Sequence, residues 1–223
     1  MMAENRDYDA LLQNISNLGD ITSSEHNATN ILLLLNGHPD WSKTLFLVGN
    51  ESASPHIEEF AGKEIDDLGW LGYFIGRSEE LEVLEVHYLP EEREQVDAFM
   101  GGVTCNQSIK KLTIRADIGD QGYDRLGCFL QNNNALTCLR LVNCHVGRDR
   151  AHNIAMALEQ CRNNSLIRFD LDNSNVSTEG LAEIATALSS QPQLEDLYLG
   201  RNNIGRDGCV ALGIRLEDGK PRA

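Results

Sequence analysis

The six cysteines form no C-x-x-C pair, and the spacings between them are irregular. Neither a thiol redox motif nor a zinc knuckle is therefore predicted, and we expect reduced thiols. Long hydrophobic runs are also missing, because stretches such as Ile31 to Leu35 are far shorter than a membrane span. Residues 1–20 carry Glu4, Asp7 and Asp9 and have no basic start followed by an apolar stretch, so no secretory signal is expected. These absences favour a cytoplasmic protein, with the nucleus as the alternative.

Positive charge is scarce, with 19 Lys and Arg against 34 Asp and Glu and a formal net charge of -15. A nucleic-acid partner, whose phosphates require Lys and Arg, is disfavoured, whereas a basic or mixed-charge protein surface would be attracted. The acidity is concentrated at residues 57–97, where 13 acids against 3 basic residues leave a net charge of -10. We therefore expect a protein partner, and neither nucleic acid nor membrane.

The second half of the chain repeats one phrase, L-x-x-L-x-L-x-x-N/C-x-L. The copies that begin at Leu136 and Leu194 match it at every apolar and Asn/Cys position, and the copy at Leu166 keeps the phase with Phe and Ser substitutions. Weaker copies begin at Leu81 and Ile109. The five starts are separated by 28, 27, 30 and 28 residues. Such a constant period is typical of a repeat architecture.

A degenerate opening copy, Leu45 to Asn50, keeps the same phase but has Ser42 at its first position, 39 residues before the next start. The long gap predicts an insertion at 51–67, ahead of the apolar segment 68–75. We therefore divide the chain into a helical amino-terminal cap at 1–40 and a repeat domain at 41–223. The domain comprises a degenerate first repeat at 42–80 and regular repeats that start at 81, 109, 136, 166 and 194.

Each unit is predicted to be a short strand followed by a helix, which gives an α/β fold. Apolar residues at helical spacing follow the phrase, as at Leu181, Ile184 and Leu188. Ser177 and Thr178, placed just before Glu179, indicate a helix start. The apolar residues at the fourth and sixth positions are expected to face a core that neighbouring units share, since no unit can close a core alone.

The ninth position of the phrase is expected to turn inward after the strand. There, a polar side chain can hydrogen-bond backbone groups that the bend leaves unpaired. We therefore interpret Cys144, Asn202 and Asn50 as structural residues.

Units of about 28 residues, with a closing phrase N-N-I-G-x-x-G at 202–208, resemble the ribonuclease-inhibitor-like subfamily of leucine-rich repeats. The resemblance covers Leu81 to Leu216. It implies a right-handed horseshoe solenoid with a parallel β-sheet on the concave side and helices on the convex side, used mainly as a non-catalytic scaffold for protein binding. It also leaves two alternatives open: a GTPase-activating protein of the Ran type, and a fragment of a larger intracellular receptor or adaptor.

Side chains alternate across a strand, so the third, fifth and seventh positions of each phrase are predicted to face out of the concave sheet. From these positions we assign to partner binding the residues Glu85, His87, Lys111, Arg115, Arg140, Arg168, Asp170, Asp172, Asp196 and Tyr198.

Two interpretations of these charges are open. A basic middle and an acidic far end would orient a partner of mixed charge. Alternatively, neighbouring strands satisfy one another, with Arg140 and Arg168 facing Asp170 and Asp196. The rings of His87 and Tyr198 are candidate anchors, because aromatic residues are enriched in binding hot spots.

Catalytic and metal-binding interpretations are weaker. Cys144 and His145 form the sole adjacent Cys-His pair, but the cysteine occupies the inward repeat position. Asp170, Asp172 and Ser174 alternate like the start of a calcium loop, yet the required glycine and glutamate are replaced by Asn175 and Leu181. The glycines recur in phase with the repeat and are read as turn and helix-start residues, namely Gly147, Gly180, Gly205 and Gly208. We expect no enzymatic activity, cofactor or metal.

Overall fold

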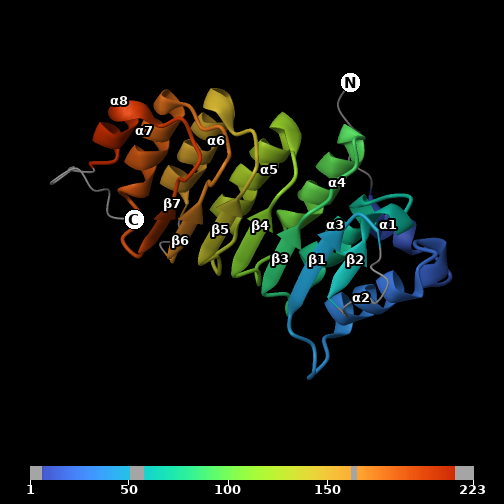
Figure 1. Ribbon diagram of the computed structural model, residues 1–223. Helices are drawn as coiled ribbons and strands as arrows, with labels where there is room; N and C mark the ends of the chain where they lie inside the picture. The colour runs from blue at the N-terminus through green and yellow to red at the C-terminus, as the bar shows by residue number, and fades with distance from the viewer. Residues whose placement is uncertain (1–6, 51–57, 162–164, 214–223) are drawn as a thin grey trace.

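The computed structural model describes residues 7–50, 58–161 and 165–213. Within these ranges a single sheet contains seven strands in the order β2-β1-β3-β4-β5-β6-β7, each parallel to its neighbours (Figure 1). The predicted α/β class and parallel sheet are confirmed. The strands are β1 (Thr44–Val48), β2 (Glu59–Ala61), β3 (Val83–Val86), β4 (Lys111–Ile114), β5 (Cys138–Leu141), β6 (Arg168–Asp170) and β7 (Asp196–Tyr198).

A layer of helices covers one face of this sheet (Figure 1). Each strand from β3 onward is followed by a helix, and consecutive helices from α3 to α8 pack against one another. The predicted strand-then-helix unit is therefore confirmed in the five regular repeats. The helical segments are α1 (Tyr8–Leu12), η1 (Leu18–Asp20), α2 (Glu25–Asn36), η2 (Gly62–Glu64), α3 (Gly69–Arg77), α4 (Arg93–Val103), α5 (Gly119–Asn132), α6 (Gly147–Gln160), α7 (Thr178–Leu188) and α8 (Gly205–Ala211).

The strand register follows the phase of the phrase. Leu139 pairs with Leu112 on one side and with Phe169 on the other, so fourth positions form one row across the sheet. Leu141 pairs with Ile114 in the sixth-position row. All five side chains are buried in a core that the helices complete. Successive units therefore share one apolar seam, because each contributes one layer to it.

The ninth positions form a polar ladder beneath the strand ends. The Cys144 thiol, the Ser174 hydroxyl and the Asn202 amide each donate to the sixth-position carbonyl of the preceding unit, at 3.4, 2.5 and 2.7 Å. The structural interpretation of Cys144 and Asn202 is confirmed. It is wrong for Asn50, whose side chain is exposed; the next described element after β1 is the edge strand β2 and not a helix, so this copy lacks the strand-then-helix order of the regular units.

A second polar ladder, which was not predicted from the sequence, lies three residues before the first apolar position of the phrase. The buried Asn106 side chain donates to the carbonyls of Ile75 and Ser78 in the preceding unit. Asn133 repeats the pattern one unit later, with bonds to the carbonyls of Asn106 and Ile109. These amides join the loops that lead from each helix into the next strand.

The amino-terminal edge of the sheet is closed by α2. Strand β2 lies inside the segment 51–67, which was expected to be only an insertion, and it pairs with β1 to form the edge. The buried Asn27 side chain on α2 both donates to and accepts from the backbone of Ala61, each at 2.9 Å, and Asn30 donates to the Glu59 carbonyl at 2.8 Å. Side-chain amides thus occupy backbone groups that an edge strand would otherwise leave open.

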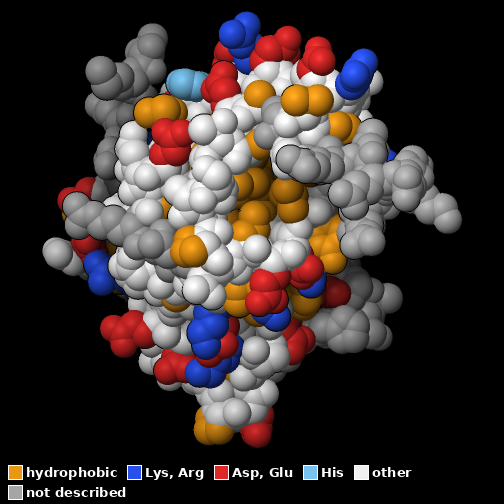
Figure 2. Space-filling model, turned by 90° about the vertical axis from the view of Figure 1, so that its left-hand side faces the viewer, with side chains coloured by type: hydrophobic (Ala, Val, Ile, Leu, Met, Phe, Trp, Pro, Cys, Tyr) orange, Lys and Arg blue, Asp and Glu red, His pale blue; other side chains and the backbone are white. Residues whose placement is uncertain are grey.

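The opposite edge is less well covered. Leu197 in β7 was expected to face the core, but it is 37% exposed, whereas the aligned Leu139 is fully buried. Figure 2 looks onto this end of the molecule and shows hydrophobic side chains gathered near its centre. Among the described strands none lies beyond β7, so the seam lacks one neighbour there.

Candidate protein-binding surface

The sheet face opposite the helices, called the open face below, displays side chains in three rows. Third-position residues run from Thr44 through Lys111 to Asp196, and fifth-position residues from Phe46 through Arg140 to Tyr198. The register thus brings the third- and fifth-position candidates onto one surface. Seventh-position residues follow the strand ends, so the assigned His87, Arg115 and Asp172 lie just past the paired segments.

Cross-strand ion pairs occupy the middle and far end of the open face. Arg140 Nε donates to Asp170 Oδ2 at 3.0 Å, and Arg168 Nη2 lies 2.5 Å from Asp196 Oδ2. Both pairs named in the alternative interpretation are therefore present. Asp170 is buried and also accepts the Asp172 backbone N–H at 2.9 Å, so its main role is to hold its neighbours in position.

Other assigned side chains differ in how far they are engaged. Glu85 and His87 bond to each other at 3.0 Å, and the Arg168 guanidinium lies over the Tyr198 ring, 5.4 Å from its centroid. By contrast, no carboxylate in the described ranges lies within 4.0 Å of Lys111 Nζ. Lys111 and Tyr198 are both exposed. Both side chains are therefore accessible to another molecule.

At the amino-terminal end of the open face, the side chains that β1 and β2 contribute were not among the predicted binding residues. Phe46 and Val48 project from β1, half-buried, beside His87, and the rings of Phe46 and His87 lie edge to face with centroids 6.2 Å apart. The sequence did contain a signal for Phe46 and Val48. Leu45 and Leu47 occupy the inward fourth and sixth positions of the degenerate copy, so the residues that alternate with them point outward. Glu59 could not be foreseen, since the strand that places it beside Phe46 was not predicted.

The structure supports the packing interpretation of Cys144. Burial raises the pKa of its thiol to about 12, so the thiolate that acts as nucleophile or ligand is suppressed at neutral pH. Gly147 and Gly205 begin α6 and α8 with φ of +56° and +57°, which agrees with a turn and helix-start role.

In the part of the chain that the structure describes, no cluster of three or more His, Cys, Asp or Glu side chains could hold a metal ion. Nor is any helix in those ranges long and apolar enough to cross a membrane.

Comparison with models of known protein families finds no match. No curated protein matches the chain either.

Proposed function

We propose that this protein is a ribonuclease-inhibitor-like leucine-rich-repeat horseshoe whose open face is its concave side, and that it is a non-catalytic scaffold that binds a protein partner there. The observation that carries the proposal is the alignment of outward side chains in rows across consecutive parallel strands. A rigid sheet presents such side chains on a backbone that is already ordered, so binding requires no ordering of the main chain. The strand-helix period of about 28 residues supports the assignment to this class of repeat.

The charge arrangement favours a protein partner of mixed charge. Arg140 and Arg168 are held by Asp170 and Asp196, so each guanidinium is already oriented before a partner arrives. Lys111 supplies a cation without a carboxylate neighbour in the described structure, and Tyr198 supplies an exposed ring beside Arg168. Ordered charges beside an aromatic anchor are the components of specific recognition.

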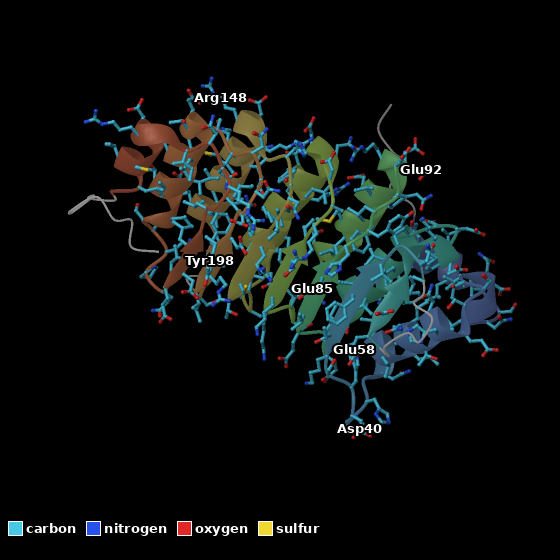
Figure 3. The ribbon with its side chains drawn as sticks, in the orientation of Figure 1. Asp40, Glu58, Glu85, Glu92, Arg148 and Tyr198 are labelled. Carbon is cyan, nitrogen blue, oxygen red and sulfur yellow. The ribbon has the colours of Figure 1, made fainter. Side chains whose placement is uncertain are left out.

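The test compares two faces of the molecule. The open-face variant combines Lys111→Glu with Tyr198→Ala, which changes exposed side chains and leaves both cross-strand ion pairs intact. The matched control combines Arg148→Glu with Met156→Ala on α6, where both side chains are also exposed (Figure 3 labels Arg148 and Tyr198). Each variant reverses one positive charge and truncates one large exposed side chain.

Immobilised wild type and both variants are compared in affinity capture with mass spectrometry. We expect proteins that bind wild type and the control to be lost from the open-face variant. Capture of the same proteins by all three forms would refute the assignment of binding to the open face.

A further inference from the structure

An apolar groove with an acidic wall lies at the amino-terminal end of the open face. Its floor is formed by Phe46 and Val48 of β1, and its wall by Glu58 and Glu59 where β2 begins. Ser42, Thr44 and His87 complete the lining. Figure 3 places Glu58 beside β1 and β2, at the opposite end of the sheet from Tyr198. The groove is thus continuous with the proposed binding face but separate from its far end.

The lining of the groove carries negative charge that is not balanced by Lys or Arg. Glu59 pairs in register with Phe46, so both side chains stand on the same face of the sheet. Oε2 of Glu59 is buried and has no hydrogen-bond partner in the structure. Among the residues that line the groove there is no Lys or Arg, and residues 57–97 carry a net charge of -10, from 13 acids and 3 basic residues.

A buried carboxylate oxygen without a partner is unfavourable, because it has lost water and gained no donor. A cation placed beside the Glu59 carboxylate would offset this cost by neutralising its charge. The floor of the groove favours a different group, because Phe46 and Val48 offer apolar surface to a neighbour. Lys and Arg side chains combine both properties, with an aliphatic stem and a charged end.

We propose that this groove binds a Lys or Arg side chain of an extended basic peptide segment in the protein partner. The aliphatic stem lies over Phe46 and Val48, and the cation reaches the carboxylate of Glu59, with Glu58 adding negative charge at the wall. The inference rests on the proposed scaffold function and adds the chemistry of the partner.

The experiment measures binding of a fluorescein-labelled peptide of alternating lysine and serine by fluorescence anisotropy at physiological salt. We expect saturable binding to wild type and none for the peptide with glutamate in place of lysine. Glu59→Gln keeps the shape of the side chain and removes its charge, so affinity should fall on the order of tenfold. Phe46→Ala should weaken binding comparably although it changes no charge.

The charge-matched control distinguishes a site from general attraction to an acidic protein. Glu91→Gln with Glu92→Gln removes two exposed carboxylates away from the groove. Glu58→Gln with Glu59→Gln removes two half-buried carboxylates within it, so the two pairs change the net charge equally. Figure 3 shows Glu92 well separated from Glu58. The control pair should leave affinity within about twofold of wild type, because screened surface charges contribute little. Equal losses in the two pairs would overturn the proposal.

Two further outcomes separate this inference from the proposed function. Wild-type affinity in both Glu59→Gln and Phe46→Ala would eliminate the groove as the site. If the open-face variant loses its captured partners while Glu59→Gln keeps them, the scaffold function stands and the groove proposal fails. Circular dichroism of each variant establishes that it is folded.

Discussion

Two leucines at the same position of the phrase allow the shared core to be tested by one substitution. Leu139 in β5 and Leu197 in β7 both occupy the fourth position and lie in the same register row, with Phe169 between them. Leu139 lies between two neighbouring repeat units and has no exposed surface, whereas Leu197 is 37% exposed at the end of the sheet. Replacing each leucine with alanine therefore removes the same atoms from two different environments.

The expected costs follow from burial. Leu→Ala removes the equivalent of about three methylene groups, or roughly 2.4 kcal/mol of transfer free energy at full burial. At Leu139 the neighbouring layers restrict collapse, and the residual cavity raises the total to about 3–5 kcal/mol. At Leu197 the transfer contribution scales with the buried fraction to about 1.5 kcal/mol, and solvent fills the space, so no cavity remains.

The assay is urea unfolding monitored by far-ultraviolet circular dichroism. Unfolding free energies are compared between variants that have the same m value, which is the slope of the free energy against urea concentration. Leu139→Ala should lower the unfolding free energy by at least about 1.5 kcal/mol more than Leu197→Ala. Equal losses would mean that the β7 edge is as well packed as the middle of the sheet. A loss below about 0.5 kcal/mol at Leu139, the range of ordinary surface substitutions, would refute the shared apolar seam.

Three other perturbations address the edges and contacts of the fold. Asn27→Ala removes both hydrogen bonds to the backbone of Ala61, so it should lower the urea-unfolding free energy by about 1–3 kcal/mol; no change would mean that α2 does not close this edge. Gly102→Ala would place a Cβ 2.1 Å from the carbonyl carbon of Gly72 and should cost about 1–3 kcal/mol despite the better helix propensity of alanine, whereas a stabilised variant would contradict the close α3–α4 contact. Because the raised pKa keeps the Cys144 thiol protonated, iodoacetamide at pH 7–9 should modify the exposed cysteines first and leave Cys144 intact by mass spectrometry; early modification of Cys144 would contradict its burial.

The repeat phrase was sufficient to predict the middle of the molecule. When apolar residues recur at fixed positions with a constant period, equivalent positions of neighbouring units can pack against one another in a shared core. The pairing of Leu112 with Leu139 therefore followed from the phrase. The ladder of Asn106 and Asn133 could have been found in the same way, because Asn163 and Gln191 stand at the corresponding positions of later units. Both are local patterns that repeat along the chain.

The ends of the sheet and the pairing of charges depended on contacts that no repeat encodes. Strand β2 joins the edge and is sealed by Asn27, far away in the sequence, and the short segment that forms it has no counterpart in the other units. The sequence left open whether Arg140 pairs with Asp170 or stays free for a partner, and the side-chain geometry of the adjacent strands showed that the two residues form an ion pair. The sequence by itself therefore determined the strand-and-helix layer and the positions of its buried residues, because every unit repeats the same pattern. Tertiary structure alone decided how the layers end and which outward groups remain available, because these depend on single contacts between distant residues.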